Sequence, residues 1–211
     1  TDDTRIRMQE NWKKGGARNC RIWSYVGDQD EVFYDFTLTR EGIGPAKILE
    51  EYEGYVQADA ASTFDALFRD GTRTEVGCWA HARRYFHDAM DLFPQECARA
   101  IALIQILYKI EADGRGDPVK LAELRRTQSA AALDQIREYL DELLQRPTKK
   151  DPLAKAAQYA NNHWQALRRY IEEPYLSVDN NACERSLRCV AVGRKNWVFA
   201  GSKDGGKRAA T

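Results

Sequence analysis

The sequence has no long apolar run, no surplus of charge and few cysteines. A membrane-spanning helix needs about 18 consecutive apolar residues, and no stretch of the sequence approaches that length, so no membrane partner is expected. Lysine and arginine together number 32, as do aspartate and glutamate, so the formal net charge is zero. A uniformly basic protein is therefore excluded, and any binding to a polyanion must come from a local surplus of positive charge.

Signatures of several enzyme classes are also missing. The chain has no P-loop, no glycine-rich dinucleotide fingerprint and no Ser-His-Asp order. Its five cysteines are odd in number and form no CxxC pair, which predicts free thiols in a reducing cytoplasm. Cys78 and His81 have C-x2-H spacing, but a structural zinc ion needs about four ligands and no partner pair is evident.

The first 90 residues mix strand and helix patterns. Alternating apolar and polar residues predict strands at 4–9, 20–26 and 31–39, joined as an antiparallel meander. A helix at 46–52, a strand at 55–59, a short helix at 62–68, a strand at 74–79 and a basic helix at 80–90 are expected to follow. By itself this order predicts only a mixed α/β fold.

The middle of the chain is different. Helices are predicted at 94–113, 118–145 and 152–173, and apolar residues of the second recur close to every 3.6 positions. We therefore expect a core formed by residues 1–90 and 173–211, interrupted by an all-helical insertion at 91–172. The chain opens at Thr1 without an initiator methionine, which predicts a piece of a longer protein.

The most informative stretch lies near the C-terminus and begins at Asp179 with the sequence DNNACERSLR, followed from Gly193 by GRKNW. On a helix Glu184 and Arg188 share a face, and seven basic residues outnumber three acidic ones from position 179 onward. A carboxylate beside several cations fits a metal ion that acts on phosphates. An ordinary amphipathic helix with an i,i+4 ion pair explains the spacing equally well.

The exact amino-acid sequence of this stretch is more specific than the spacing of its charged residues. Residues 179–210 (DNNACERSLRCVAVGRKNWVFAGSKDGGKRAA) closely resemble the end of the catalytic domain of the IS66-family bacterial transposases. TDDT at 1–4, YVQAD at 55–59 and CWAHARR at 78–84 resemble the same family, in the family's order. The resemblance covers nearly the whole chain and is loosest in the helical middle. It implies a DDE-type recombinase with an RNase H-like fold, a mixed sheet flanked by helices.

The resemblance also implies a catalytic triad formed by Asp2, Asp59 and Glu184. These acids would hold two Mg²⁺ or Mn²⁺ ions, and oxygen ligands suit such metals. The family pattern Asp-Glu-Thr reads Asp2-Asp3-Thr4 here, which leaves Asp3 as an alternative first acid. We prefer Asp2 because it matches the family's aspartate.

Two other acids are weaker alternatives. Asp28 follows a predicted strand and is more simply a surface acid. Asp179 could replace Glu184 as a ligand, but an aspartate before a helix is more simply an N-cap.

Basic residues complete the expected site. By resemblance His81 would lie beside the scissile phosphate and orient it or stabilise charge, and the alternative is a surface helix with basic residues. The expected contacts to the DNA backbone are Arg83, Arg84, Arg185, Arg188, Arg194 and Lys195. Residues 205–211 alternatively form a solvated, flexible tail.

The function implied by the resemblance is metal-dependent DNA strand cleavage and strand transfer during transposition of an insertion sequence. Expected partners are DNA at the transposon ends and the target, further copies of the same chain on that DNA, and accessory proteins of the same element. We keep two alternatives, which are a catalytically silent DNA-binding or assembly fragment and a general RNase H-like nuclease.

Overall fold

The computed structural model describes residues 1–9, 16–29, 31–59, 62–148, 150–197 and 200–210, except for the side chains of residues 62 and 197. The chain divides into two compact units. The sheet unit comprises Thr1–Glu75 and Asn180–Thr211, and the helical unit comprises Val76–Asp179. Over the described residues, no helix has the length and apolar character needed to cross a membrane.

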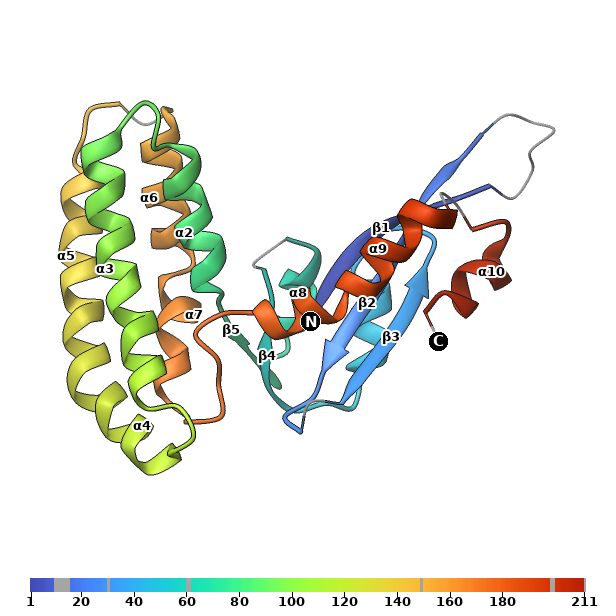
Figure 1. The fold of residues 1–211 in the computed structure, drawn as a ribbon, viewed down its shortest axis with the longest axis horizontal. Coiled ribbons are helices and arrows are strands. Elements are labelled where there is room, and N and C mark those ends of the chain that lie inside the picture. The colour runs from blue at the N-terminus through green and yellow to red at the C-terminus, as the bar shows by residue number, and fades with distance from the viewer. Residues whose placement is uncertain (10–15, 30, 60–61, 149, 198–199, 211) are drawn as a thin grey trace. The chain divides into compact units, whose positions relative to one another are not determined.

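The sheet unit confirms the expected α/β class. An antiparallel sheet is formed by β1 (Asp2–Met8), β2 (Arg18–Val26) and β3 (Val32–Thr37), in that order (Figure 1). A second, two-stranded sheet is formed by β4 (Gly54–Gln57) and β5 (Arg73–Val76). Between these strands lie α1 (Ile43–Ile48) and the 3-10 helix η2 (Ser62–Phe68). The C-terminal segment adds α8 (Asn181–Ser186), α9 (Arg188–Trp197) and α10 (Lys203–Arg208).

The two faces of the three-stranded sheet bury different partners, because successive strand side chains point to opposite sides. One face presents Ile6, Met8, Cys20, Ile22 and Phe36, which pack with Leu187, Val190, Ala200 and Ala210 of the C-terminal segment. On the other face Trp23 packs with Ala58, Phe64 and Leu67. The C-terminal segment therefore covers the face that begins with Asp2, and the segment from β4 to η2 covers the face that begins with Asp3.

The expectation of a flexible tail is wrong for residues 205–208, which belong to α10. The side chain of Ser202 caps this helix by accepting a hydrogen bond from the Gly205 backbone N–H. Gly206 is buried, and a Cβ added there would lie 2.4 Å from the ring of Phe36. Glycine at this position permits close packing of α10 against the sheet, a role that composition alone does not distinguish from flexibility.

The helical unit contains α2, α3, α5 and α6, which pack side by side (Figure 1). Its elements are α2 (Trp79–Asp88), α3 (Pro94–Asp113), α4 (Pro118–Leu124), the π-helical turn η3 (Arg125–Ser129), α5 (Ala130–Leu144), α6 (Pro152–Asn162), α7 (Trp164–Arg168) and the 3-10 helix η4 (Arg169–Ile171). Within the described part of residues 91–172 there is no strand. Proline follows the capping residues Asp117 and Asp151 at the starts of α4 and α6, as helix N-termini favour.

Candidate functional site

Two adjacent aspartates at the start of β1 have opposite surroundings. The carboxylate of Asp3 is 1% exposed, and it accepts hydrogen bonds from Arg21 Nη1 at 2.8 Å and Arg40 Nε at 2.9 Å. Asp2 accepts a hydrogen bond from the Asp3 backbone N–H at 2.7 Å. Asp3 is thus neutralised by two guanidinium groups, and its neighbour on the opposite face is not held by either of these arginines.

The acid Asp2 lies near two other carboxylates. The pKa of Asp2 is raised from 3.8 to about 6. Burial is the largest cause, the hydrogen bond from the Asp3 backbone lowers the pKa, and the negative charges of Asp59, Glu184 and Asp3 contribute to the rise. Asp2, Asp59 and Glu184 are called the acid cluster below. The sheet unit therefore brings two of the sequence-predicted acids, Asp59 and Glu184, within electrostatic range of the third, Asp2.

The end of β4 brings Asp59 toward Asp2. The Thr1 backbone nitrogen donates a hydrogen bond to the Gln57 carbonyl at 2.6 Å, which places the end of β4 beside the start of β1. Ala58, which precedes the acid, is 1% exposed and packs with Trp23. Because Ala58 fills the core, Asp59 emerges at the rim, where its Oδ2 lies 3.6 Å from Nη2 of Arg40.

Contacts with Ser24 position Glu184. Ser24 is the cross-strand partner of Asp2, so both side chains point to the same face of the sheet. The Ser24 hydroxyl lies 2.5 Å from the hydroxyl of Ser186, and the Ser24 carbonyl accepts a hydrogen bond from Cys183 Sγ at 3.2 Å. These contacts hold α8 over the strand position opposite Asp2, and they account for the influence of Glu184 on its pKa.

The N-cap position of this helix is held by Asn180 rather than Asp179, so the expectation of an Asp179 N-cap is wrong. Asn180 occupies the N-cap position of α8 and makes no side-chain cap, since its amide donates instead to the Thr1 carbonyl at 3.0 Å. Asp179 belongs to the helical unit, where it accepts a hydrogen bond from Tyr108. Burial, and then Asp179, raise the pKa of Tyr108.

The chemistry of the acid cluster fits a hard divalent cation, because carboxylate oxygens are the ligands that Mg²⁺ prefers. Its arrangement is more open than a formed site. In the part of the chain that the structure describes, no three His, Cys, Asp or Glu side chains are grouped closely enough to hold a metal ion. A metal would have to draw the carboxylates together.

The predicted DNA-contacting residues fall into different environments. Arg185, Arg188 and Lys195 are exposed on α8 and α9. Arg194 is half-buried, and its Nη1 donates to Thr4 Oγ1 at 2.8 Å and to the Arg5 carbonyl at 2.7 Å. The first three side chains are available to a phosphate, whereas Arg194 attaches α9 to β1.

Three other predicted residues lie on α2 of the helical unit. His81 is half-buried in the first turn, and Arg83 and Arg84 are exposed. Their proposed roles beside a scissile phosphate or along DNA stay predictions.

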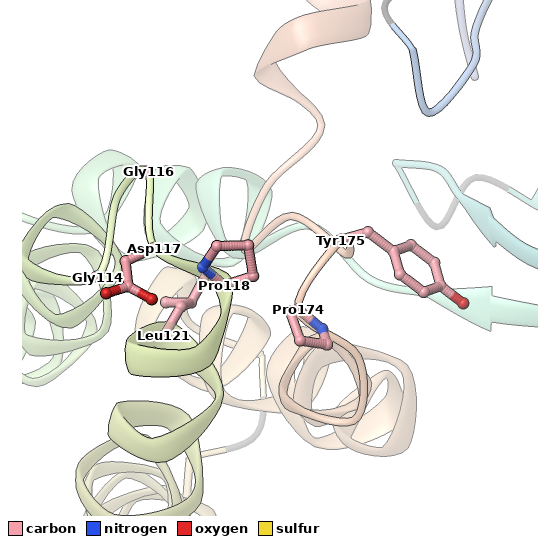
Figure 2. A pocket seen from close by; sticks show the side chains of 7 residues that line it. All are labelled: Gly114, Gly116, Asp117, Pro118, Leu121, Pro174 and Tyr175. Carbon is pink, nitrogen blue, oxygen red and sulfur yellow. The ribbon is translucent and has the colours of Figure 1, made fainter.

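A pocket of about 430 Å³ lies at the start of α4 in the helical unit (Figure 2). Pro118, Leu121 and Pro174 contribute to its mainly apolar wall. Among the described lining residues Asp117 carries the one carboxylate, and this group caps α4 by accepting a hydrogen bond from the Lys120 backbone N–H. The pocket therefore lacks the converging polar groups of a catalytic site.

Sequence reasoning missed Arg40, Arg21 and Ser24, which surround the acids. Arg21 could have been found from strand parity, because an antiparallel register places it diagonally across from Asp3. Arg40 follows β3 in a loop, and no spacing pattern in the sequence links it to either aspartate.

Comparison with known proteins gives a consistent result. The model of the transposase IS66 family matches residues 1–208. Among curated proteins of Sinorhizobium fredii (strain NBRC 101917 / NGR234), the uncharacterized protein y4qI is 30% identical over 93% of this chain and 40% of its own length. The uncharacterized protein y4hP is 30% identical over 99% of this chain and 42% of its own length. The chain thus spans less than half the length of these relatives. No solved structure matches it.

Proposed function

Given that the chain belongs to the transposase IS66 family, we propose that it is the catalytic part of a DDE-type transposase. It would cleave DNA strands at the ends of an insertion sequence and join the freed 3′-hydroxyl groups to target DNA. The proposed fold is RNase H-like, and the order of three antiparallel strands, a helix, β4, η2, β5 and α2 supports this assignment.

The observation that carries the proposal is the acid cluster itself. The carboxylates of Asp59 and Glu184 come from separate elements far apart in the sequence, and both raise the pKa of Asp2. Ordinary folding gives no reason to collect like charges in this way. Asp2, Asp59 and Glu184 would be the residues that hold the metal. When bound, divalent ions would activate the attacking oxygen and stabilise the leaving oxygen.

The surroundings of the two N-terminal aspartates favour Asp2 as the first acid. Asp3 is buried between two arginines, so binding a metal would require breaking charge-assisted hydrogen bonds. Asp2 lies on the face covered by α8, which carries Glu184. We therefore assign Asp3 to holding the strand ends and Asp2 to the triad.

Basic residues would bind the substrate. The exposed Arg185, Arg188 and Lys195 are suited to contacts with DNA phosphates. His81, Arg83 and Arg84 are proposed to act on the same DNA. Assembly of several copies on DNA, accessory proteins and a location at the nucleoid stay predictions.

One observation favours the catalytically silent alternative. In the described residues the acids are not grouped as a formed metal site. An assembly or DNA-binding module would not need a metal site, so this observation fits such a module. The raised pKa of Asp2 favours the catalytic proposal, because a silent module has no need for neighbouring carboxylates.

Glu184→Gln separates these functions, since it removes a charged ligand and nearly preserves shape. The protein is incubated in Mg²⁺ with a labelled duplex that carries a free 3′-hydroxyl and with supercoiled plasmid. We expect nicking and joining by the wild type and a loss of about a hundredfold or more in the variant, the range typical of removing an essential catalytic group. Glu142→Gln, a change to an exposed carboxylate of the helical unit, should match the wild type.

The outcome also ranks the alternatives. Wild-type activity in folded Glu184→Gln would remove Glu184 from the triad. Binding of DNA without any cleavage by the wild type would favour the silent module. Preferential cleavage of an RNA–DNA hybrid would favour a general nuclease.

A further inference from the structure

We propose that Arg40 is an internal counter-ion of the acid cluster, which a divalent metal ion displaces from Asp59 on binding. The inference rests on the proposed function, because it takes Asp2, Asp59 and Glu184 as the metal-holding residues. It adds a positioning residue that sequence reasoning did not find.

Arg40 contacts two acids, and the two contacts differ. Its Nε donates to Asp3 Oδ1 at 2.9 Å, which is a normal hydrogen-bond length. Its Nη2 lies 3.6 Å from Asp59 Oδ2, close enough for charge attraction but beyond a good hydrogen bond. The guanidinium is therefore fixed in place by its hydrogen bond to Asp3, whereas its contact with Asp59 is charge attraction without a good hydrogen bond.

Asp3 keeps Arg40 nearby when the other contact breaks. Its buried carboxylate is also bonded to Arg21, so it has little freedom to leave. The Arg40 side chain is 41% exposed, so its Nη2 end has access to solvent. Exposed ion pairs contribute little to stability, and this contact is therefore inexpensive to exchange.

A divalent cation competes for the same oxygen of Asp59. It carries twice the charge of a guanidinium and favours carboxylate ligands, so it gains more from Asp59 than Arg40 does. Attraction of Asp59 to Arg40 also offers a reason why the described acids are near one another without forming a closed group. The arginine lowers the repulsion among the acids before metal arrives and opposes the metal until it moves.

The test is calorimetric titration of the whole chain with Mn²⁺ at low salt. Arg40→Ala removes the competing charge, so the Mn²⁺ dissociation constant should fall by about three- to fivefold, the upper part of the range for an exposed ion pair. Arg40→Gln should behave alike and can still donate to Asp3, which provides a second variant if alanine impairs folding. Arg7→Ala removes an exposed positive charge from the same strand as Asp2 and should change the constant by less than about twofold, because solvent and salt screen it.

Each outcome decides the inference. Unchanged or weaker Mn²⁺ binding in both Arg40 variants overturns it, as does equal tightening in Arg7→Ala. Asp59→Asn keeps the two failures apart. If Asp59→Asn abolishes binding that the wild type shows, the proposed metal site stands whatever Arg40 does. If the wild type shows no saturable binding, or Asp59→Asn binds equally well, the proposed site fails and the inference with it.

Discussion

Each of the two units contains an arginine that contacts carboxylate groups, and the two arginines differ in how completely their hydrogen-bonding groups are satisfied. In the helical unit Arg125 is 1% exposed and forms two hydrogen bonds with Glu111, at 2.8 and 2.6 Å. It also donates to the carbonyls of Tyr170, Glu173 and Leu176. In the sheet unit Arg40 is substantially exposed and only approaches Asp59.

The difference separates a structural ion pair from one that we propose to be functional. Burying a charge is costly unless nearly all its hydrogen-bonding groups are satisfied, as they are around Arg125. Such a site has no capacity left for a ligand. At the acid cluster the negative charges of Asp59 and Glu184 raise the pKa of Asp2, so a bound cation would lower the electrostatic energy at Asp2. Incomplete compensation is thus the better indicator of function.

The largest expected change in the free energy of unfolding concerns Arg125, whose hydrogen-bonding groups are all satisfied. Arg125→Ala leaves Glu111 and three carbonyls without their donor, so it should lower the free energy of unfolding by about 3–5 kcal/mol. Urea denaturation followed by circular dichroism measures the change. Arg126→Ala is the matched control, because this neighbouring side chain is 72% exposed and pairs with Glu123, and it should cost less than about 0.5 kcal/mol. Equal losses in the two variants would mean that burial does not distinguish the two arginines.

A smaller effect is expected where the sheet unit is closely packed. Gly206→Ala places a methyl group against Phe36 and should lower the free energy of unfolding by about 1–3 kcal/mol, the usual range for overpacking. At Gly205 the nearest atom to an added Cβ is Ser202 Oγ at 3.5 Å, so Gly205→Ala should be neutral or slightly stabilising. The same urea assay compares them. A tolerated Gly206→Ala would mean that α10 packs loosely.

At the acid cluster, removing a charged side chain should raise the free energy of unfolding rather than lower it. The folded-state pKa of Asp2 is raised to about 6, mainly by burial and then by the neighbouring carboxylates, so ionising Asp2 destabilises the folded protein. The free energy of unfolding then falls as pH rises from about 4 to about 6. Asp2→Asn stays neutral and should be about 1 kcal/mol more stable than the wild type at pH 7, a value reduced for solvent screening.

This gain should fade as the pH falls from 6 toward 4, because the wild-type carboxyl is then protonated as well. Urea denaturation of both proteins in the presence of a chelator, at pH 7 and at pH 4, measures the difference in the free energy of unfolding. A variant less stable than the wild type at pH 7 would contradict the assignment of Asp2 as an uncompensated acid.

Local patterns predicted much of the fold. The 94–113 helix has the bounds of α3, because proline at the start and glycine after the end mark both termini. The 118–145 helix is interrupted by η3, whose wider turn accompanies the burial of Arg125. That interruption depends on contacts with residues 170–176, which no local window contains.

The acids could be proposed from resemblance, but their electrostatic states could not. Whether Asp2 or Asp3 is compensated depends on Arg21 and Arg40, which are brought to Asp3 by strand pairing and by a loop. The single mixed sheet expected of the fold is divided in the described residues into two smaller sheets. Pairing between distant strands depends on the whole chain rather than on short sequence patterns.

The smallest expected effects concern the exposed cations of α8 and α9, which differ from their internally bonded neighbour Arg194. Arg188 and Lys195 are open, whereas Arg194 is bonded to Thr4 and Arg5. Arg188→Ala and Lys195→Ala should each make the log–log salt dependence of binding to random-sequence duplex less steep by about one unit, because one phosphate contact is lost. Fluorescence anisotropy at several salt concentrations measures the slope.

Arg194→Ala should instead lower the free energy of unfolding by about 1–2 kcal/mol, since it breaks hydrogen bonds between α9 and β1, and leave the slope unchanged. A slope reduced in folded Arg194→Ala as much as in Arg188→Ala would show that this guanidinium also reaches phosphate. An internally bonded arginine would then both stabilise the fold and bind DNA. The number of internal hydrogen bonds that an arginine makes would then no longer distinguish structural cations from functional ones in this protein.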